Sequence, residues 1–76
     1  MTKAMRRELR SICSRIENSY QCLYEICREQ TLKYDMMKES DQLDRIGQAL
    51  KAENDLLTDA VNLIRAAMQR IEDITQ

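Results

Sequence analysis

The chain has 76 residues with 12 basic and 13 acidic side chains, a single Gly, and no Pro, His, Trp or Phe. This length allows one small domain, residues 1–76, and the scarcity of turn residues and aromatic strand residues excludes a sheet-rich fold. The net charge of −1 argues against a nucleic-acid binder. Without His, a phosphate-binding Gly loop or a nucleophile beside a base, the chain is predicted to be no enzyme and to need no metal or cofactor.

The first predicted helix covers about residues 3–34. Aliphatic side chains recur there in alternating steps of three and four, which is the spacing of a seam along one helix face. The core residues predicted on this helix are Leu9, Ile12, Ile16, Leu23 and Ile26. A second apolar line, one position to the side, widens this face and contains Cys13, Tyr20 and Cys27.

A turn is predicted at about residues 35–41. Leu23 and Leu43 are twenty residues apart, one short of three heptads, so a single straight helix would rotate its apolar stripe at this junction. Residues 38–42 are all polar, and Ser40 or Asp41 could cap the helix that follows. The alternative is one continuous helix, or a bend that opens on binding.

The second predicted helix covers about residues 42–75. Its predicted core residues are Leu43, Ile46, Leu50, Leu57, Ala60, Ile64, Ala67 and Ile71. A turn near residue 38 would place Leu9 opposite Ala67 and Ile26 opposite Leu50. Glu53 interrupts this seam and could fix its register.

The charges are divided unevenly along the chain. Residues 1–34 carry a net charge of +3 and residues 35–76 a net charge of −4. This asymmetry favours an antiparallel pairing that sets Arg6 and Arg7 near Glu72 and Asp73, although each exposed ion pair contributes only about 0–1 kcal/mol.

The second helix presents more apolar surface than the first helix can cover. Its flanks carry the residues predicted to bind a partner, together with a Gly that allows close approach of another backbone: Gly47, Leu56, Val61, Leu63 and Met68. A contiguous exposed apolar patch indicates an interaction surface. The predicted fold is therefore an all-α, antiparallel two-helix hairpin, completed either by self-association as a homodimer or by another helical protein.

The cysteines and the hydropathy favour a cytoplasmic protein. Cys13, Cys22 and Cys27 form an odd set that diverges around one helix, so no disulfide forms within it. They are interpreted as small core hydrophobes or, alternatively, as a reactive or intermolecular thiol. No apolar run reaches the roughly 20 residues of a membrane span.

Two resemblances to known families suggest functions. The short helical hairpin with the aliphatic cluster Leu56 to Ile64 resembles the small co-chaperones of type III secretion needle subunits. That resemblance implies a cytosolic adaptor that pairs with a helical-repeat chaperone and keeps the needle subunit from polymerising. Locally, the stretch Asp41 to Ile46 is similar to SNARE motifs, which implies a membrane-fusion helix. A self-assembling structural coiled coil is the remaining alternative.

Overall fold

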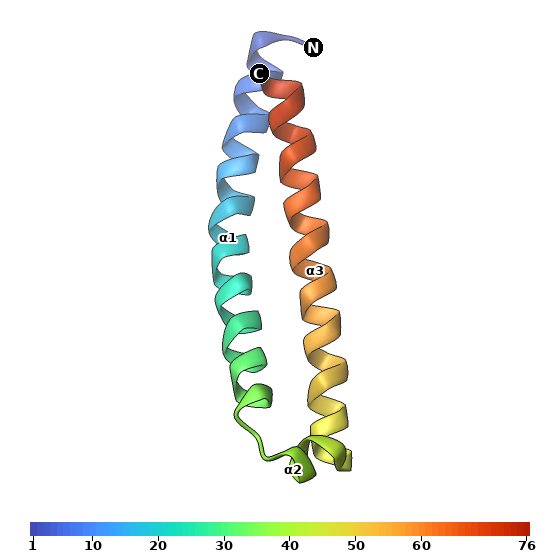
Figure 1. Ribbon diagram of the computed structural model, residues 1–76. Helices are drawn as coiled ribbons and strands as arrows, with labels where there is room; N and C mark the ends of the chain where they lie inside the picture. The colour runs from blue at the N-terminus through green and yellow to red at the C-terminus, as the bar shows by residue number, and fades with distance from the viewer.

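The computed structural model describes residues 1–76 as three helices without a strand. Helix α1 spans Lys3–Asp35, the short α2 spans Glu39–Leu43, and α3 spans Arg45–Thr75. Helices α1 and α3 lie side by side in opposite directions, with both chain ends at one extremity and α2 at the other (Figure 1). The Cα atoms extend over 57 × 15 × 14 Å, so the molecule has a long, hairpin-like shape. The predicted all-α class is confirmed.

Both long helices begin at a side-chain cap. The Thr2 hydroxyl accepts a hydrogen bond of 3.1 Å from the N–H of Met5 at the start of α1. At the start of α3, the Asp44 carboxylate accepts one of 2.9 Å from the N–H of Gly47, because the backbone of Asp44 is extended. The predicted cap at Ser40 or Asp41 is wrong, since both residues lie inside α2.

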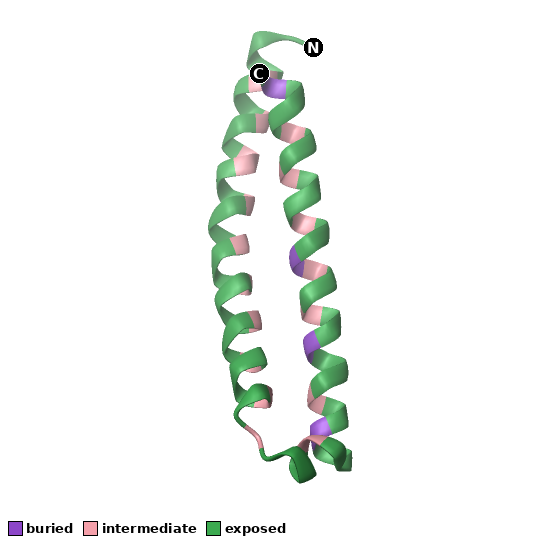
Figure 2. Cartoon of the chain, viewed as in Figure 1, coloured by how far each residue is buried: buried purple, intermediate pink, exposed green.

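Helices α1 and α3 face each other along lines that alternate in steps of three and four residues, which is the heptad period of a coiled coil. We call this contact the hairpin seam. On α1 the half-buried residues of the seam are Leu9, Cys13, Ile16, Tyr20, Leu23, Cys27, Gln30 and Tyr34. On α3 the buried and half-buried residues are Gly47, Leu50, Asn54, Leu57, Val61, Ile64, Met68, Ile71 and Thr75. Burial follows this single line on each helix (Figure 2).

The seam includes a polar layer. The Asn54 side chain is only 8% exposed, and its Nδ2 donates a hydrogen bond of 3.1 Å to the carbonyl oxygen of Gln30. The Asn54 Oδ1 is buried and accepts no hydrogen bond within the chain. The one buried apolar side chain is that of Val61, at 4% exposure, and no side chain is fully buried. Two helices alone therefore enclose very little apolar core.

Several residues predicted for the core lie beside the seam instead. Ile12 is half-buried at its edge, and Ala60 and Ala67 lie on the same flank of α3. Ile26 and Ile46 are 51% and 74% exposed, and Leu43, at 70%, belongs to α2 and not to the seam. On α1 the line that contains Leu9 has an apolar line on each side. One of these contains Ile12 and the other contains Cys13, and only the line of Cys13 faces α3. On each helix the seam therefore keeps one predicted line, that of Leu9 on α1 and of Leu57 on α3, and replaces the other predicted line by its neighbour one position along the chain.

The pairing of the helices also differs from the prediction. The Tyr20 hydroxyl accepts hydrogen bonds from Arg65, and Asn54 donates to Gln30, whereas the predicted turn would have placed Tyr20 opposite Leu57. The actual contacts are displaced along α3 by about two helical turns near Tyr20 and Gln30, and by about one turn near the chain ends. The cause is α2, which lengthens the connection and moves the reversal of the chain toward the start of α3.

The predicted ion pairs across the hairpin are absent. Guanidinium groups of α1 instead bind the end of α3: Arg6 donates to the carbonyl oxygen of Ile74, and Arg10 donates to that of Thr75 over 2.8 Å. The last carbonyls of a helix lack partners within the helix and carry its partial negative charge. These carbonyls attract the arginines in place of the acidic side chains. The single ion pair in the chain joins Lys51 to Asp55 within α3, at 3.8 Å.

Gly47 is the point where α2 contacts α3. A Cβ atom added there would lie 2.7 Å from backbone atoms of Gln42 and would also collide with the carbonyl oxygen of Asp41. The Gln42 side chain fastens α2 to α1 as well, because its Nε2 donates a hydrogen bond of 2.9 Å to the carbonyl oxygen of Tyr34. The close backbone approach expected at Gly47 is thus present, but the approaching backbone is α2 of the same chain.

Candidate docking surface

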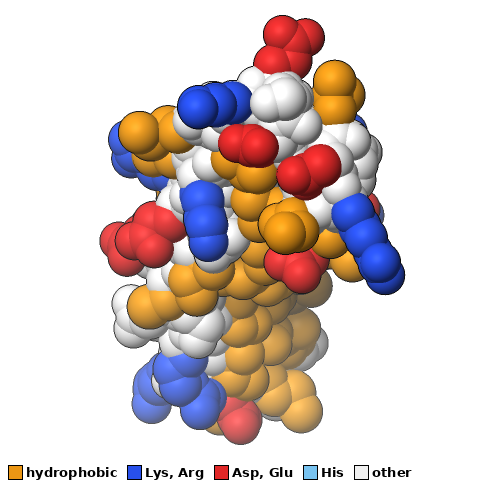
Figure 3. Space-filling view, turned by 90° about the horizontal axis from the view of Figure 1, so that it is seen from below, with side chains coloured by type: hydrophobic (Ala, Val, Ile, Leu, Met, Phe, Trp, Pro, Cys, Tyr) orange, Lys and Arg blue, Asp and Glu red, His pale blue; other side chains and the backbone are white.

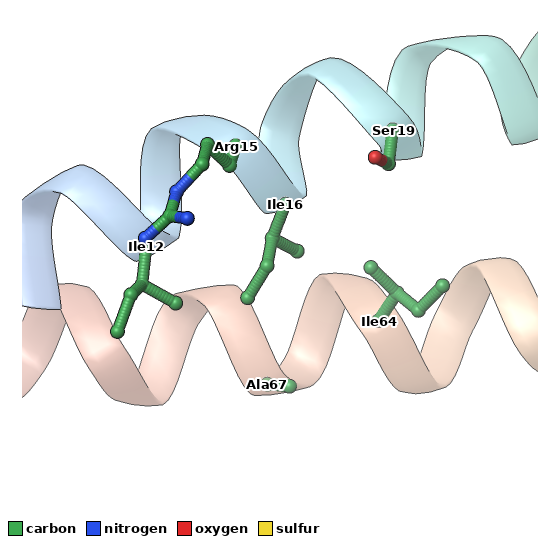
Figure 4. A pocket seen from close by; sticks show the side chains of 6 residues that line it. All are labelled: Ile12, Arg15, Ile16, Ser19, Ile64 and Ala67. Carbon is green, nitrogen blue, oxygen red and sulfur yellow. The ribbon is translucent and has the colours of Figure 1, made fainter.

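One side of the hairpin is hollowed between α1 and α3. The groove is lined from α1 by Ile12, Arg15, Ile16 and Ser19, and from α3 by Ile64 and Ala67. Figure 4 shows Ile12 and Ile16 extending from α1 toward α3, with the Ile64 side chain between the two helices. The floor of the groove is aliphatic, and its polar atoms belong to the side chains of Arg15 and Ser19 at the edge on α1.

A second depression continues this groove toward the chain ends. It is lined by Met1, Met5, Glu8, Leu9 and Ile12, so the two depressions share Ile12. Met5 is 55% exposed and Met1 is 63% exposed. The apolar surface therefore extends from the middle of the rod to its free end.

The same surface also extends toward α2, because residues seven apart lie on one line of a coiled-coil helix. Ile26 lies two heptads beyond Ile12, while Ala60 and Ile46 lie one and three heptads before Ala67. Leu56 and Leu63 lie on the adjacent line of α3, at the outer edge, and are 70% and 71% exposed. We call this surface the open apolar face, and its members are Met5, Ile12, Ile26, Ile46, Leu56, Ala60, Leu63, Ala67 and Ile74. Figure 3, which looks along the rod from the α2 end, shows apolar side chains gathered on one side.

The opposite side of the hairpin is closed by polar contacts. Arg65 donates two hydrogen bonds to the Tyr20 hydroxyl, from Nε over 3.0 Å and from Nη2 over 2.6 Å, and its guanidinium carbon lies 5.7 Å from the centre of the tyrosine ring. The Cys27 Sγ lies 3.7 Å from the Thr58 hydroxyl on this side. The two sides of the rod therefore differ in kind, since one is joined by hydrogen bonds across the helices and the other is aliphatic and open.

The structure divides the residues that were predicted to bind a partner. Leu56 and Leu63 are exposed on the open apolar face, as a docking role requires. Val61 and Met68 lie on the hairpin seam, and Gly47 lies beneath α2, so these three residues are not available to a partner. The main part of the face, the lines of Ile12 and Ala67, was instead assigned to the hairpin core. Its aliphatic spacing was visible in the sequence, but the side of the helix that it occupies was not.

The chain shows little other chemistry. No group of three or more acidic or cysteine side chains is arranged to hold a metal ion. All three cysteines are free, with Cys22 exposed and Cys13 and Cys27 half-buried. None of the helices combines the length and apolar character that a membrane span requires.

Comparisons of the chain with known protein families, with curated proteins and with solved structures found no match. The functional argument therefore depends on the open apolar face itself.

Proposed function

We propose that the chain is a protein–protein interaction module that docks its open apolar face on the helices of another polypeptide. The observation that carries this proposal is the distribution of apolar residues. On α1 the seam takes up the line of Cys13 and Tyr20, whereas the aliphatic line of Ile12 remains open on one side. Burial of each isoleucine or leucine side chain contributes about 1.5–3 kcal/mol. An open face with several of them therefore offers binding energy that the pairing of α1 with α3 leaves unused.

The more specific form of the proposal is a small cytoplasmic co-chaperone or adaptor of a type III secretion system. Its support is the resemblance of the short helical hairpin and its aliphatic second helix to such co-chaperones. In that role the open apolar face would bind a helical chaperone or the secreted subunit. A self-assembling coiled-coil protein is the second candidate, and the heptad spacing of the lines of Ile12 and Ala67, which stay open beside the seam, favours it.

A photoreactive side chain placed in the groove tests whether this face binds a protein. A benzophenone amino acid at Ser19, which lines the groove, should give one defined cross-linked product when the chain is irradiated in its cells of origin. The matched control replaces Asn62, which lines the depression on the opposite side and is also exposed. Mass spectrometry should identify the product at position 19 and little at position 62. Equal yields at the two positions, or none at position 19, would exclude this face as the binding surface.

The proposed docking also requires that α1 and α3 are paired in the free chain as a closed, antiparallel hairpin. Spin labels at positions 7 and 73, in a variant whose native cysteines are replaced, should report a separation of about 20 Å by electron double resonance. A single continuous helix would separate the same positions by roughly 100 Å, at a rise of 1.5 Å per residue. The long distance would show that the face is assembled only after binding, if at all.

A further inference from the structure

We propose that the occupant of the open apolar face is a second copy of this chain. This inference rests on the proposed function and names the partner of the same surface. The two hairpins pair face to face about a two-fold axis parallel to their long axes. Helix α1 of each copy then lies on α3 of the other, so that four helices surround a shared apolar core and every neighbouring pair is antiparallel.

The size of the face suits a homodimer. The rod is 57 Å long, and the open apolar face follows it from Met5 and Ile74 near the chain ends to Ile46 beside α2. A stable protein–protein interface of ordinary size buries about 800 Å² on each partner. A two-fold interface also places the same patch on both sides, so a mostly aliphatic surface of this shape is complementary to itself.

Two charged residues on the face indicate how the copies are oriented. Lys33 is the only charged residue on the α1 line that contains Ile12, and Glu53 is the only one on the α3 line that contains Ala67. Both lie within one helical turn of the contact between Gln30 and Asn54, so they stand at the same level along the rod. They are not paired with each other inside the hairpin, whose one ion pair joins Lys51 to Asp55.

Face-to-face pairing about the long axis joins these two charges between copies. Because rotation about this axis keeps every residue at its own level, Lys33 of one copy meets Glu53 of the second copy, and symmetry repeats the contact. If Lys33 and Glu53 were buried without pairing, each would lose its hydration and gain no opposite charge in return. A two-fold axis across the rod would instead bring Lys33 beside the basic start of α1 in the other copy, where Arg6 and Arg7 repel it.

The apolar residues at other levels are compatible with the same arrangement. The contact of Tyr20 with Arg65 sets the level of Ser19 close to that of Ala67, so two small side chains meet near the middle of the interface. Ile26 meets the small Ala60 on the side toward α2. Large residues opposite small ones allow helix surfaces to interdigitate. Arg15 and Arg70 approach each other only at the outer edge, where their long side chains extend into water.

Charge reversal tests both the partner and the orientation. Sedimentation equilibrium should find the unmodified chain dimeric at micromolar concentration, and Lys33→Glu or Glu53→Lys alone should each weaken the dimer at least about tenfold, because two like-charged pairs replace two opposite ones. Mixing the two variants should restore a dimer as stable as that of the unmodified chain, since the Glu at position 33 then meets the Lys at position 53 and the one remaining pair, Lys33 with Glu53, is also opposite in charge. Circular dichroism should show unchanged helicity, as both positions are exposed.

The control is Lys51→Glu, which removes the ion pair within α3 and should not affect dimerisation. Variants that dimerise like the unmodified chain, or a mixture that fails to restore the dimer, would overturn the proposed arrangement. The chain could instead stay monomeric up to about 100 μM while position 19 cross-links to a different protein. That result would overturn the second copy as occupant and leave the proposed function intact. Failure of cross-linking at position 19 would instead contradict the proposed function.

Discussion

Val61→Asp should unfold the hairpin, whereas Leu63→Asp, only two residues away on α3, should leave it folded. Val61 is 4% exposed and is the only buried apolar side chain, so a carboxylate there loses most of its hydration. Such burial costs several kcal/mol, which is comparable to the about 5–15 kcal/mol that holds a folded domain together. Leu63 is 71% exposed on the outer edge of the open apolar face, where a carboxylate remains in water.

Circular dichroism and thermal unfolding of the two variants at equal concentration provide the measurement. Val61→Asp should lose most of its helical signal at 25 °C, and Leu63→Asp should keep its helical signal while its association weakens. The two substitutions introduce the same side chain into the same helix, so helix propensity does not explain a difference between them. Full helicity in the Val61 variant would mean that α1 does not pack against this side of α3.

Gly47→Ala should lower stability, although the same replacement inside an ordinary helix raises it. Alanine is favoured over glycine by about 1 kcal/mol in a helix interior. At this position the added methyl group would lie 2.7 Å from backbone atoms of Gln42, so either α2 must move away or α3 must bend. Overpacking of this kind typically costs about 1–3 kcal/mol. The hydrogen bond from Gln42 to the carbonyl oxygen of Tyr34 would be lost together with the position of α2.

Ala49→Gly, at an exposed position two residues further on, supplies the control because it should cost the ordinary propensity of about 1 kcal/mol and leave α2 in place. Denaturant unfolding gives the change in free energy, and amide exchange of residues 39–43 reports whether α2 remains attached. A Gly47→Ala chain more stable than the unmodified one would show that α2 does not rest on α3.

The long helices could be predicted from the sequence, but their contacts could not. The predicted limits of about 3–34 and about 42–75 lie close to the observed Lys3–Asp35 and Arg45–Thr75, because heptad spacing and the polar connecting segment are local signals. Helix α2 has no such signal. It has five residues, and it is held by Gly47 and the carbonyl oxygen of Tyr34, which belong to other parts of the fold.

The candidate site illustrates a different limit. On α1, the line of Leu9, Ile16 and Leu23 has an apolar line on each side, so periodicity alone permits either one to face α3. The prediction places the aliphatic side in the core because of its three-four spacing. The structure selects the other side, where the Tyr20 ring is half-buried and its hydroxyl reaches Arg65. That interaction crosses between distant parts of the chain, and no local pattern of residues reveals it.

The hydrogen bonds from Arg6 and Arg10 to the end of α3 bear on the order in which the hairpin opens. The only connection between α1 and α3 runs through α2. Contacts between the helices near α2 therefore close short loops of chain, and contacts near the chain ends close the longest loops. Local opening therefore begins at the free ends, where a rod of two helices frays. The guanidinium groups of Arg6 and Arg10 bind the carbonyl oxygens of Ile74 and Thr75 and so stabilise the free ends against fraying. They hold the start of α1 beside the end of α3, so the last turn of the open apolar face stays assembled before anything binds to it.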